Sequence, residues 1–178
     1  MIEGFVPFGS PTYLGLLGCV LLARGADFLS TWVATPRLTL EANPLSRALG
    51  WRWGAVVNVA LAVAVALWPL PAVMLATASL LVAARNFQSA WLARGMGETA
   101  YRSWLIERLS QTGRGLFITC TVAQAALVGV VGGGLFWASP VQSVTGAMGL
   151  GVMTYSLAVL VFPLLGARRL WRVTRHSA

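Results

Sequence analysis

The sequence predicts an all-α integral membrane bundle of about five transmembrane helices, with one further amphipathic helix at the membrane surface. Hydrophobic residues form 57% of the 178-residue chain and charged residues only 10%. The mean hydropathy is +0.74, which is too apolar for a soluble protein with a single core. We therefore expect residues 1–178 to form a single transmembrane helical domain.

Five apolar segments are each long enough, or nearly so, for the roughly 20 residues that a spanning helix needs. They cover residues about 12–34, 53–68, 71–93, 115–137 and 141–166. The residues before the first segment include Glu3 and no basic residue, which is unlike a cleavable signal peptide. We expect the first segment to remain as a helix.

Prolines separate the second segment from the third, in the sequence Trp68-Pro69-Leu70-Pro71. Proline breaks a helix, and one unbroken apolar run across both segments would be too long for a bilayer. We therefore expect a tight hairpin between two spans rather than one long kinked helix.

The arginines predict the orientation in the membrane. All 13 basic residues are arginine, and 11 of them fall outside the predicted spans. With five helices and the N-terminus outside, these 11 all lie on the inner side: Arg37, Arg47, Arg52, Arg94, Arg102, Arg108, Arg114, Arg168, Arg169, Arg172 and Arg175. Positive residues concentrate on the cytoplasmic side, so the C-terminus is predicted inside. Nucleic acid is not an expected partner, because the charge is divided among short loops and a tail.

Residues 98–111 are expected to form the amphipathic helix, on the cytoplasmic leaflet. Tyr101, Trp104, Leu105 and Leu109 share one side at helical spacing, and the charged residues lie largely elsewhere. Aromatic residues beside arginines favour a membrane-surface position over the alternative, an ordinary connecting loop.

Asp27 is the only carboxylate inside a predicted span, and an ionisable group there is expensive and suggests a functional site. Arg24, Asp27 and Thr31 stand at i, i+3 and i+7 and so share one helix face. Asp27 can pair with Arg24 locally or with Arg85 across the bundle. Two interpretations stay open: a structural ion pair among Arg24, Asp27 and Arg85 without any ligand, and a binding site.

Polar residues of the other predicted spans fall near the depth of Asp27. The predicted topology brings the ends of several segments to one layer in the inner half of the membrane. The residues at this level are Asn58, Arg85, Asn86, Gln88, Thr119, Gln124 and Tyr155. This convergence suggests a cavity open to the cytoplasm.

The motif Glu41-Ala42-Asn43-Pro44 follows the first span. Asn43 before proline favours an extended or turn conformation, and Pro44 can start a short helix. Glu41 and Asn43 point the same way if the segment is extended, as hard oxygen ligands or hydrogen-bonding groups; the alternative is a solvated turn. The candidate binding residues are thus Asp27, Thr31, Glu41, Asn43, Asn58, Arg85 and Asn86.

No metal site and no cofactor are predicted. Two carboxylates without histidine fit Mg²⁺ or Ca²⁺ only loosely, and the sole histidine, His176, is on the tail. Cys19 and Cys120 lie far apart in apolar segments, which favours free, buried thiols over a disulfide or metal site.

Small residues recur in the last two predicted spans. Gly129-x-x-x-Gly133, flanked by Gly132 and Gly134, and the pair Gly146 and Gly149 allow two helices to approach closely. We expect these glycines to pack within the chain rather than form a dimer interface.

The first ninety or so residues resemble a bacterial and archaeal family of small membrane proteins, catalogued as domain of unknown function 5658. The resemblance is carried by Asp27-x-x-x-Thr31, by Glu41-x-Asn43-Pro44 and by the polar position Asn86. It implies a compact helical membrane domain and no particular activity. The basic residue expected in the second helix is absent from this chain. We expect a multi-pass protein of the bacterial or archaeal cytoplasmic membrane.

Three functions are compatible with the sequence. The first, which it favours, is an accessory or scaffolding subunit of a larger membrane complex, with lipids and other membrane chains or further copies as partners. The second is a cytoplasm-facing binding or transport site for a cation, a small solute or a lipid headgroup, centred on Asp27. The third is a membrane enzyme with Asp27 or Glu41 as general acid or base. Whether the protein is an enzyme stays open.

Overall fold

The computed structural model describes residues 4–140 and 142–175, and within them the chain is all-helical with no strand. The six helices are α1 (Pro11–Ala34), α2 (Pro44–Val65), α3 (Pro69–Met96), α4 (Glu98–Gln111), α5 (Arg114–Trp137) and α6 (Val144–Arg175). All except α4 are long and apolar enough to cross a membrane. The predicted fold class is confirmed, including the shorter helix at 98–111.

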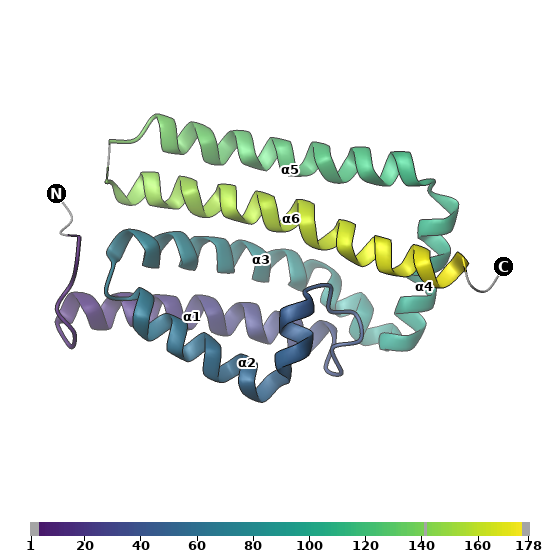
Figure 1. Ribbon diagram of the computed structural model, residues 1–178, viewed down its shortest axis with the longest axis horizontal. Coiled ribbons are helices and arrows are strands. Elements are labelled where there is room, and N and C mark those ends of the chain that lie inside the picture. Colours follow the sequence, from purple (N-terminus) through teal and green to yellow (C-terminus); the bar gives the residue numbers. More distant parts are fainter. Residues whose placement is uncertain (1–3, 141, 176–178) are drawn as a thin grey trace.

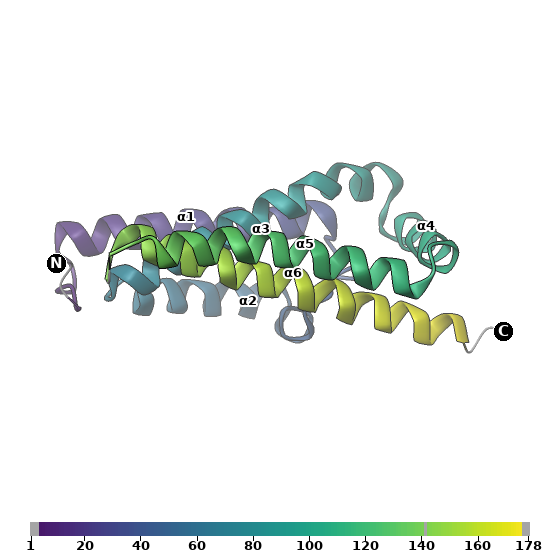
Figure 2. The same ribbon diagram turned by 90° about the horizontal axis from the view of Figure 1, so that it is seen from above.

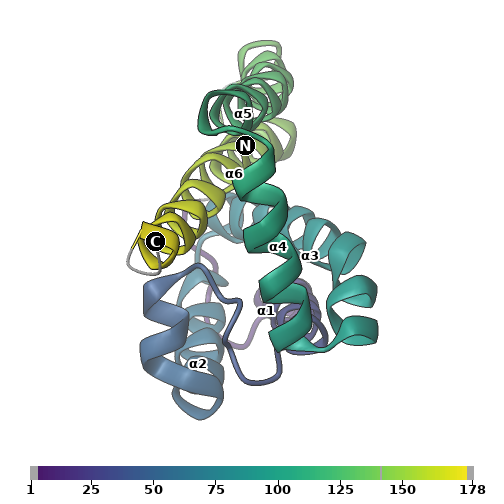
Figure 3. The same cartoon turned by 90° about the vertical axis from the view of Figure 1, so that its right-hand side faces the viewer.

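The five long helices run side by side in the order α5, α6, α3, α1 and α2 (Figure 1). The turned view shows α4 set apart from the long helices, with the two chain ends at opposite ends of the molecule (Figure 2). Seen along the long axis, α4 crosses the end of the bundle near the C-terminal end of α6 (Figure 3). We call this the inner end, because the arginine-rich segments gather there and such segments favour the cytoplasm.

Helix α2 begins at Pro44, earlier than the predicted span at 53, because it consists of two parts. Asn43 caps the first part: its side-chain oxygen accepts the N–H of Leu45 at 3.0 Å, and Pro44 takes the first helical position. The helix is interrupted at Gly50, where φ is 63°, a left-handed conformation that favours glycine. The short helix expected at Pro44 therefore exists and is joined to the span through this break.

Helix α6 begins at Val144 and continues to Arg175, beyond the predicted end at 166. The prediction ended where the apolar residues end. The helix continues because arginine and leucine have high helix propensity, so the basic tail extends the last span past the membrane. The side chains of residues 172–175 and all of His176 lie outside what the structure describes.

The predicted hairpin between the second and third spans is formed. Helix α2 ends at Val65, and Pro69 occupies the first turn of α3. The C=O of Leu67 in this turn accepts the N–H of Val6 at 2.9 Å, and the buried Tyr13 hydroxyl donates to the C=O of Val63 at 3.2 Å. The N-terminal segment thereby closes the outer end of the α1–α2–α3 group.

Glycines bring α5, α6 and α3 into close contact. A Cβ atom on Gly132 would lie 2.8 Å from the backbone N of Met153, and one on Gly149 would lie 2.8 Å from the backbone O of Gly132. A Cβ on Gly151 would lie 2.7 Å from the backbone O of Met74 on α3. Packing inside the chain is therefore confirmed for this region. Gly132 and Gly129 face α6, where a Cβ on Gly129 would lie 3.1 Å from Ser156 Oγ, whereas Gly133 faces open space.

Both cysteines are free, as expected, but Cys19 and Cys120 are exposed rather than buried. They lie on outward faces of α1 and α5 because those helices bury only narrow stripes against their neighbours.

Candidate functional site

Arg24 stands at the centre of a polar network inside the membrane-spanning region. Its Nη1 forms an ion pair with Asp27 Oδ2 at 2.9 Å and also donates to Ser79 Oγ at 3.2 Å. Its Nε donates to Asn58 Oδ1 at 2.6 Å. The guanidinium therefore joins three helices, α1, α2 and α3.

Asn58 has a second bond that fixes its orientation. Its Nδ2 donates to the C=O of Gly54 one turn earlier, at 2.7 Å. The amide oxygen is thereby turned toward Arg24, which makes Asn58 an acceptor for the guanidinium rather than a free polar group.

A second set of bonds joins α1 to α3 about two turns further toward the inner end. Asn86 Nδ2 donates to both Ser30 Oγ and Thr31 Oγ1 at 3.3 Å. Ser30 is fully buried, and its hydroxyl donates to the C=O of Asp27 at 2.8 Å. Asp27, Thr31 and Asn86, three of the residues that carry the family resemblance, thus lie in one cluster.

Sequence reasoning missed Ser30 and Ser79, although both carried a signal. Ser79 lies seven residues before Asn86 and Ser30 lies three residues after Asp27. These spacings put each serine on the helix face of a residue that was predicted. Serine is common in apolar spans and carries no charge, so it is a weak signal in the sequence, yet serine hydroxyls commonly form hydrogen bonds between transmembrane helices.

Glu41 and Asn43 have different roles in the loop between α1 and α2. Glu41 Oε1 accepts the backbone N–H of Asn43 at 2.7 Å, whereas the Asn43 side chain caps α2. Burial raises the pKa of Glu41, partly offset by backbone hydrogen bonds from Asn43 and Ala42 and by Arg47. The negative charge of Glu41 also acts electrostatically on Asp27, although no hydrogen bond joins the two residues in the described part of the chain. Glu41 therefore adjoins the network, and Asn43 serves the local turn.

Arg85 does not join this network. Asp27 pairs with Arg24 instead, and the buried Nη1 of Arg85 has no hydrogen-bond partner among the described residues. Arg85 stands one residue before Asn86, so its side chain is rotated by about 100° from the face that contacts α1. The ion pair considered among Arg24, Asp27 and Arg85 is therefore formed between Arg24 and Asp27 only, within the described part of the chain.

The remaining polar residues of the predicted layer stay apart from it. In the described part of the chain, no hydrogen bond joins Gln88, Thr119, Gln124 or Tyr155 to Arg24 or Asn86. Helices α5 and α6 are separated from α1 and α2 by α3 (Figure 1). Residues that share a predicted depth in the membrane therefore do not all lie close to one another.

Glu98 accepts several hydrogen bonds, although the sequence predicted only that it lies away from the apolar side of the helix at 98–111. Its carboxylate accepts the backbone N–H of Arg37 at 2.7 Å, the Thr35 hydroxyl at 3.2 Å and the Thr39 hydroxyl. Burial would raise the pKa of Glu98, but these hydrogen bonds together lower it. Glu98 therefore fastens the start of α4 to the loop after α1. The left-handed Gly97, with φ 80°, turns the chain into this position.

Among the residues that the structure describes, no group of three or more His, Cys, Asp or Glu side chains is placed to hold a metal ion. The absence of a metal site and of a cofactor stays a prediction. Two cavities at the inner end are lined mainly by loop, α4 and helix-end residues, and Asp27 lines neither of them.

Comparisons with protein families, with curated proteins and with solved structures found no match to the chain. The resemblance of the first ninety or so residues to a family of small membrane proteins therefore stays a prediction. The description of the site therefore rests on its geometry. It is an intramembrane ion pair whose hydrogen bonds connect three helices of the same chain.

Proposed function

We propose that this multi-pass membrane protein is an accessory or scaffolding subunit of a larger assembly in a bacterial or archaeal cytoplasmic membrane. The Arg24 network supports a structural role for the only intramembrane carboxylate. The guanidinium bonds to Asp27, Asn58 and Ser79, so the charge is compensated by groups of the same chain. Intramembrane charges usually face the interior and pair in this way.

An open glycine face on α1 carries the proposal. Gly15, Gly18, Leu22, Gly25 and Leu29 follow one another at spacings of three or four residues and so form one stripe along the helix. A Cβ atom on any of the three glycines would meet no atom within 4 Å, and Leu22 is 77% exposed. We call these five residues the α1 stripe.

The α1 stripe contrasts with the glycines of α5 and α6. Gly132 and Gly149 are in close contact within the chain, which shows how this protein uses small residues to bring helices together. Stripes of small residues promote helix association in membranes because they let backbones approach. A transmembrane helix of another chain is therefore the proposed partner of the α1 stripe.

The test is co-purification from the native membrane by gentle, lipid-preserving extraction, with mass spectrometry of the bound chains. The double variant Gly18→Leu and Gly25→Leu should lose stoichiometric partner chains that the wild type retains. Gly134→Leu is the matched control, because Gly134 also faces open space but lies on α5. Loss of the partners in the control alone, or a lone wild-type chain, would contradict the proposal.

A second candidate function is a binding or transport site for a cation, small solute or lipid headgroup centred on Asp27. It is favoured by one observation: Asp27 and Glu41 repel each other electrostatically, and a bound cation would relieve that repulsion. Under this function, Asp27→Asn should abolish ligand binding or flux while the protein stays folded. Retained binding or flux in that variant would rule the function out.

A further inference from the structure

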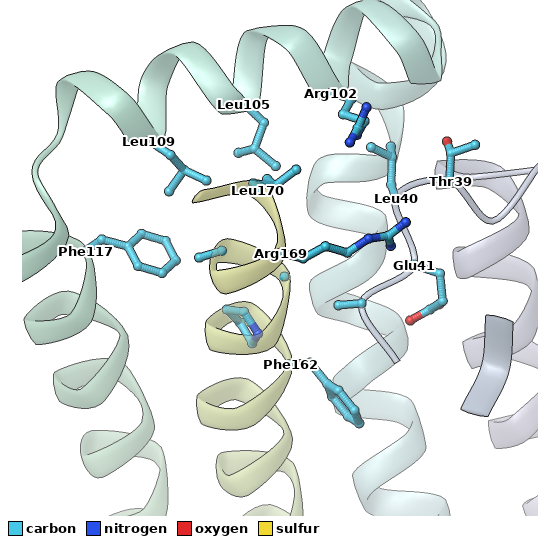
Figure 4. Close-up of a pocket in the computed structure, with 14 residues that line it drawn as sticks. Thr39, Leu40, Glu41, Arg102, Leu105, Leu109, Phe117, Phe162, Arg169 and Leu170 are labelled. Atoms are coloured by element: carbon cyan, nitrogen blue, oxygen red, sulfur yellow. The ribbon is translucent and has the colours of Figure 1, made fainter. Parts of the chain in front are cut away.

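A cavity of about 240 Å³ lies at the inner end, and Asp27 is not among the residues that line it. Its walls come from four parts of the chain: the loop at 39–42, α4, the start of α5 and the last turns of α6. Figure 4 shows these side chains converging between the crossing helix α4 and the ends of the long helices. The cavity is smaller than the about 300–1,000 Å³ of pockets for whole drug-sized ligands, so it fits one end of a larger molecule.

One side of the cavity is positively charged. Arg102 of α4 and Arg169 of α6 reach toward the loop that holds Leu40 (Figure 4). Neither guanidinium forms an ion pair or a hydrogen bond within the described part of the chain. Glu41 is the single acidic residue of the lining, and one of its oxygens already accepts the Asn43 N–H.

Several other arginines of the described chain have partners, although not all do: the buried Nη1 of Arg85, away from this cavity, has none. Arg24 is part of the intramembrane network, Arg94 lies over the Trp32 ring, Arg114 lies over the Trp171 ring and Arg108 donates to Gln111. Two arginines left without a partner beside one cavity therefore distinguish this site. Arginine is the residue best suited to binding phosphate, because its planar fork of donors matches phosphate geometry.

The other side of the cavity is apolar. It is formed by Leu105, Leu109 and Phe117, and in Figure 4 Leu109 and Phe117 lie on the side away from Arg102. The apolar lining continues along α6 at Phe162 and Leu170, next to Arg169. A fully hydrophilic anion would leave this surface without a partner. Removing it from water by contact with a hydrocarbon chain is favourable.

The predicted depth of the cavity in the membrane also fits a molecule with one charged and one apolar part. Helix α4 forms one wall, with Leu105 and Leu109 in the lining, and its predicted position is at the boundary between headgroups and acyl chains. Phosphates of membrane lipids occupy this level, with their acyl chains directed into the membrane. Charge, apolar wall and position therefore select an amphiphile with an anionic head.

We propose that this cavity binds an anionic phospholipid of the inner leaflet, with Arg102 and Arg169 contacting the phosphate and the apolar wall contacting the first part of an acyl chain. The site lies on different residues from the α1 stripe, so it stands or falls independently of the scaffold function. It also gives α4 a role beyond connecting two spans, since α4 supplies one of the two arginines.

The experiment uses the full-length protein, purified in detergent and depleted of lipid, and follows its thermal unfolding as ligand is added. Three probes are compared: phosphatidylglycerol, phosphatidylcholine with the same acyl chains, and inorganic phosphate. A ligand that binds only the folded state raises the unfolding midpoint in a saturable way. Phosphatidylglycerol should give the largest rise at the lowest concentration.

The double variant Arg102→Gln and Arg169→Gln should raise the half-saturating phosphatidylglycerol concentration about tenfold or more, as expected for loss of a charge-assisted hydrogen bond. The control is Arg108→Gln with Arg168→Gln, which removes the same charge from the same two helices but outside the cavity lining. It should bind as the wild type does. If the double variant fails to fold, the single variant Arg169→Gln gives the test, because Arg169 is exposed.

Three results would overturn the proposal. Equal stabilisation by phosphatidylcholine and phosphatidylglycerol would mean that the headgroup charge is not recognised. Equal stabilisation by inorganic phosphate would mean that the site takes a bare anion and not a lipid. An equal loss of binding in the cavity variant and in the control would assign the effect to general surface charge.

Discussion

The two halves of the molecule are held together by different physical means. In the α1–α2–α3 half, side-chain hydrogen bonds from Arg24 and Asn86 cross between helices. In the α5–α6 half, glycines allow direct backbone contact, and the interhelical bond described there is from Ser156 Oγ to the C=O of Ala125, at 2.7 Å. Both devices are common in membranes, where apolar surface alone gives helices little reason to associate.

The difference indicates where function can reside. Backbone contact leaves no room for a ligand where Gly132 and Gly149 meet, so this part of α5 and α6 is a packing unit. The polar half contains most of the residues predicted as a binding site, yet they bond mainly within the chain. The groups left available for other molecules are the α1 stripe, on an outer face, and Arg102 and Arg169, at the inner end.

The largest effect is expected where backbone contact is tightest. Gly149→Leu would place side-chain atoms where a Cβ alone already lies 2.7 Å from the Phe136 backbone N. Helices α5 and α6 would have to separate, with a loss of about 3 kcal/mol or more. Gly134→Leu, at an open position, should change stability by less than about 0.5 kcal/mol. Reversible unfolding in mixed micelles measures both; similar stabilities would refute the glycine contact.

A smaller loss is expected when the polar half is broken. Arg24→Gln removes the ion pair with Asp27 and weakens the bonds to Asn58 and Ser79. Leaving buried polar groups without partners costs about 1–3 kcal/mol, and the side chains of Arg24 and Asp27 are still 24% and 18% exposed, so about 2 kcal/mol is expected. The same unfolding assay measures it. A variant as stable as the wild type would show that the network contributes nothing to folding.

The smallest effect is local and depends on pH. The folded-state pKa of Glu98 is lowered, so its attachment of α4 stabilises the protein above the unfolded-state pKa near 4.5 and is lost as pH falls through the folded value. Burial raises the folded-state pKa of Glu41, so the effect of Glu41 on stability has the opposite sign. Its contribution to stability is present below the unfolded-state pKa and is lost as pH rises through the folded-state pKa.

Hydrogen exchange of the α4 amides checks the Glu98 prediction. Acidification should speed exchange at the start of α4, after correction for the intrinsic pH dependence of exchange. In Glu98→Gln the exchange should already be fast at neutral pH and should change little on acidification. Protection that is unchanged in this variant would show that the loop after α1 does not hold α4.

The sequence predicted the fold well because the signals were local. Apolar length located five spans, Pro44 located a helix start, the prolines at 69 and 71 located the hairpin between α2 and α3, and the spacing of Tyr101, Leu105 and Leu109 indicated the helix at 98–111. The extension of α6 to Arg175 was not predictable from hydropathy, because a helix can continue into water when its residues have high helix propensity.

The site was predicted only in part, because depth along a helix is visible in the sequence and direction around it is not. Arg24 and Asp27 met through their i, i+3 spacing, and Asn58 and Asn86 reached the same network. Arg85 has the right depth but faces another direction. Glu98 was missed because its partners come from the loop at 35–39, whose path depends on the whole fold.

The thermal unfolding midpoint of purified Asp27→Asn, compared with that of the wild type, tests the structural role of the Arg24 network most directly. The substitution keeps the shape of the side chain and removes its charge. If Asp27 serves to join helices, the midpoint falls, because Arg24 loses its counter-charge at a largely buried position. A midpoint that stays the same or rises would contradict the account, because buried charges kept for function typically reduce stability, and removing them stabilises the protein.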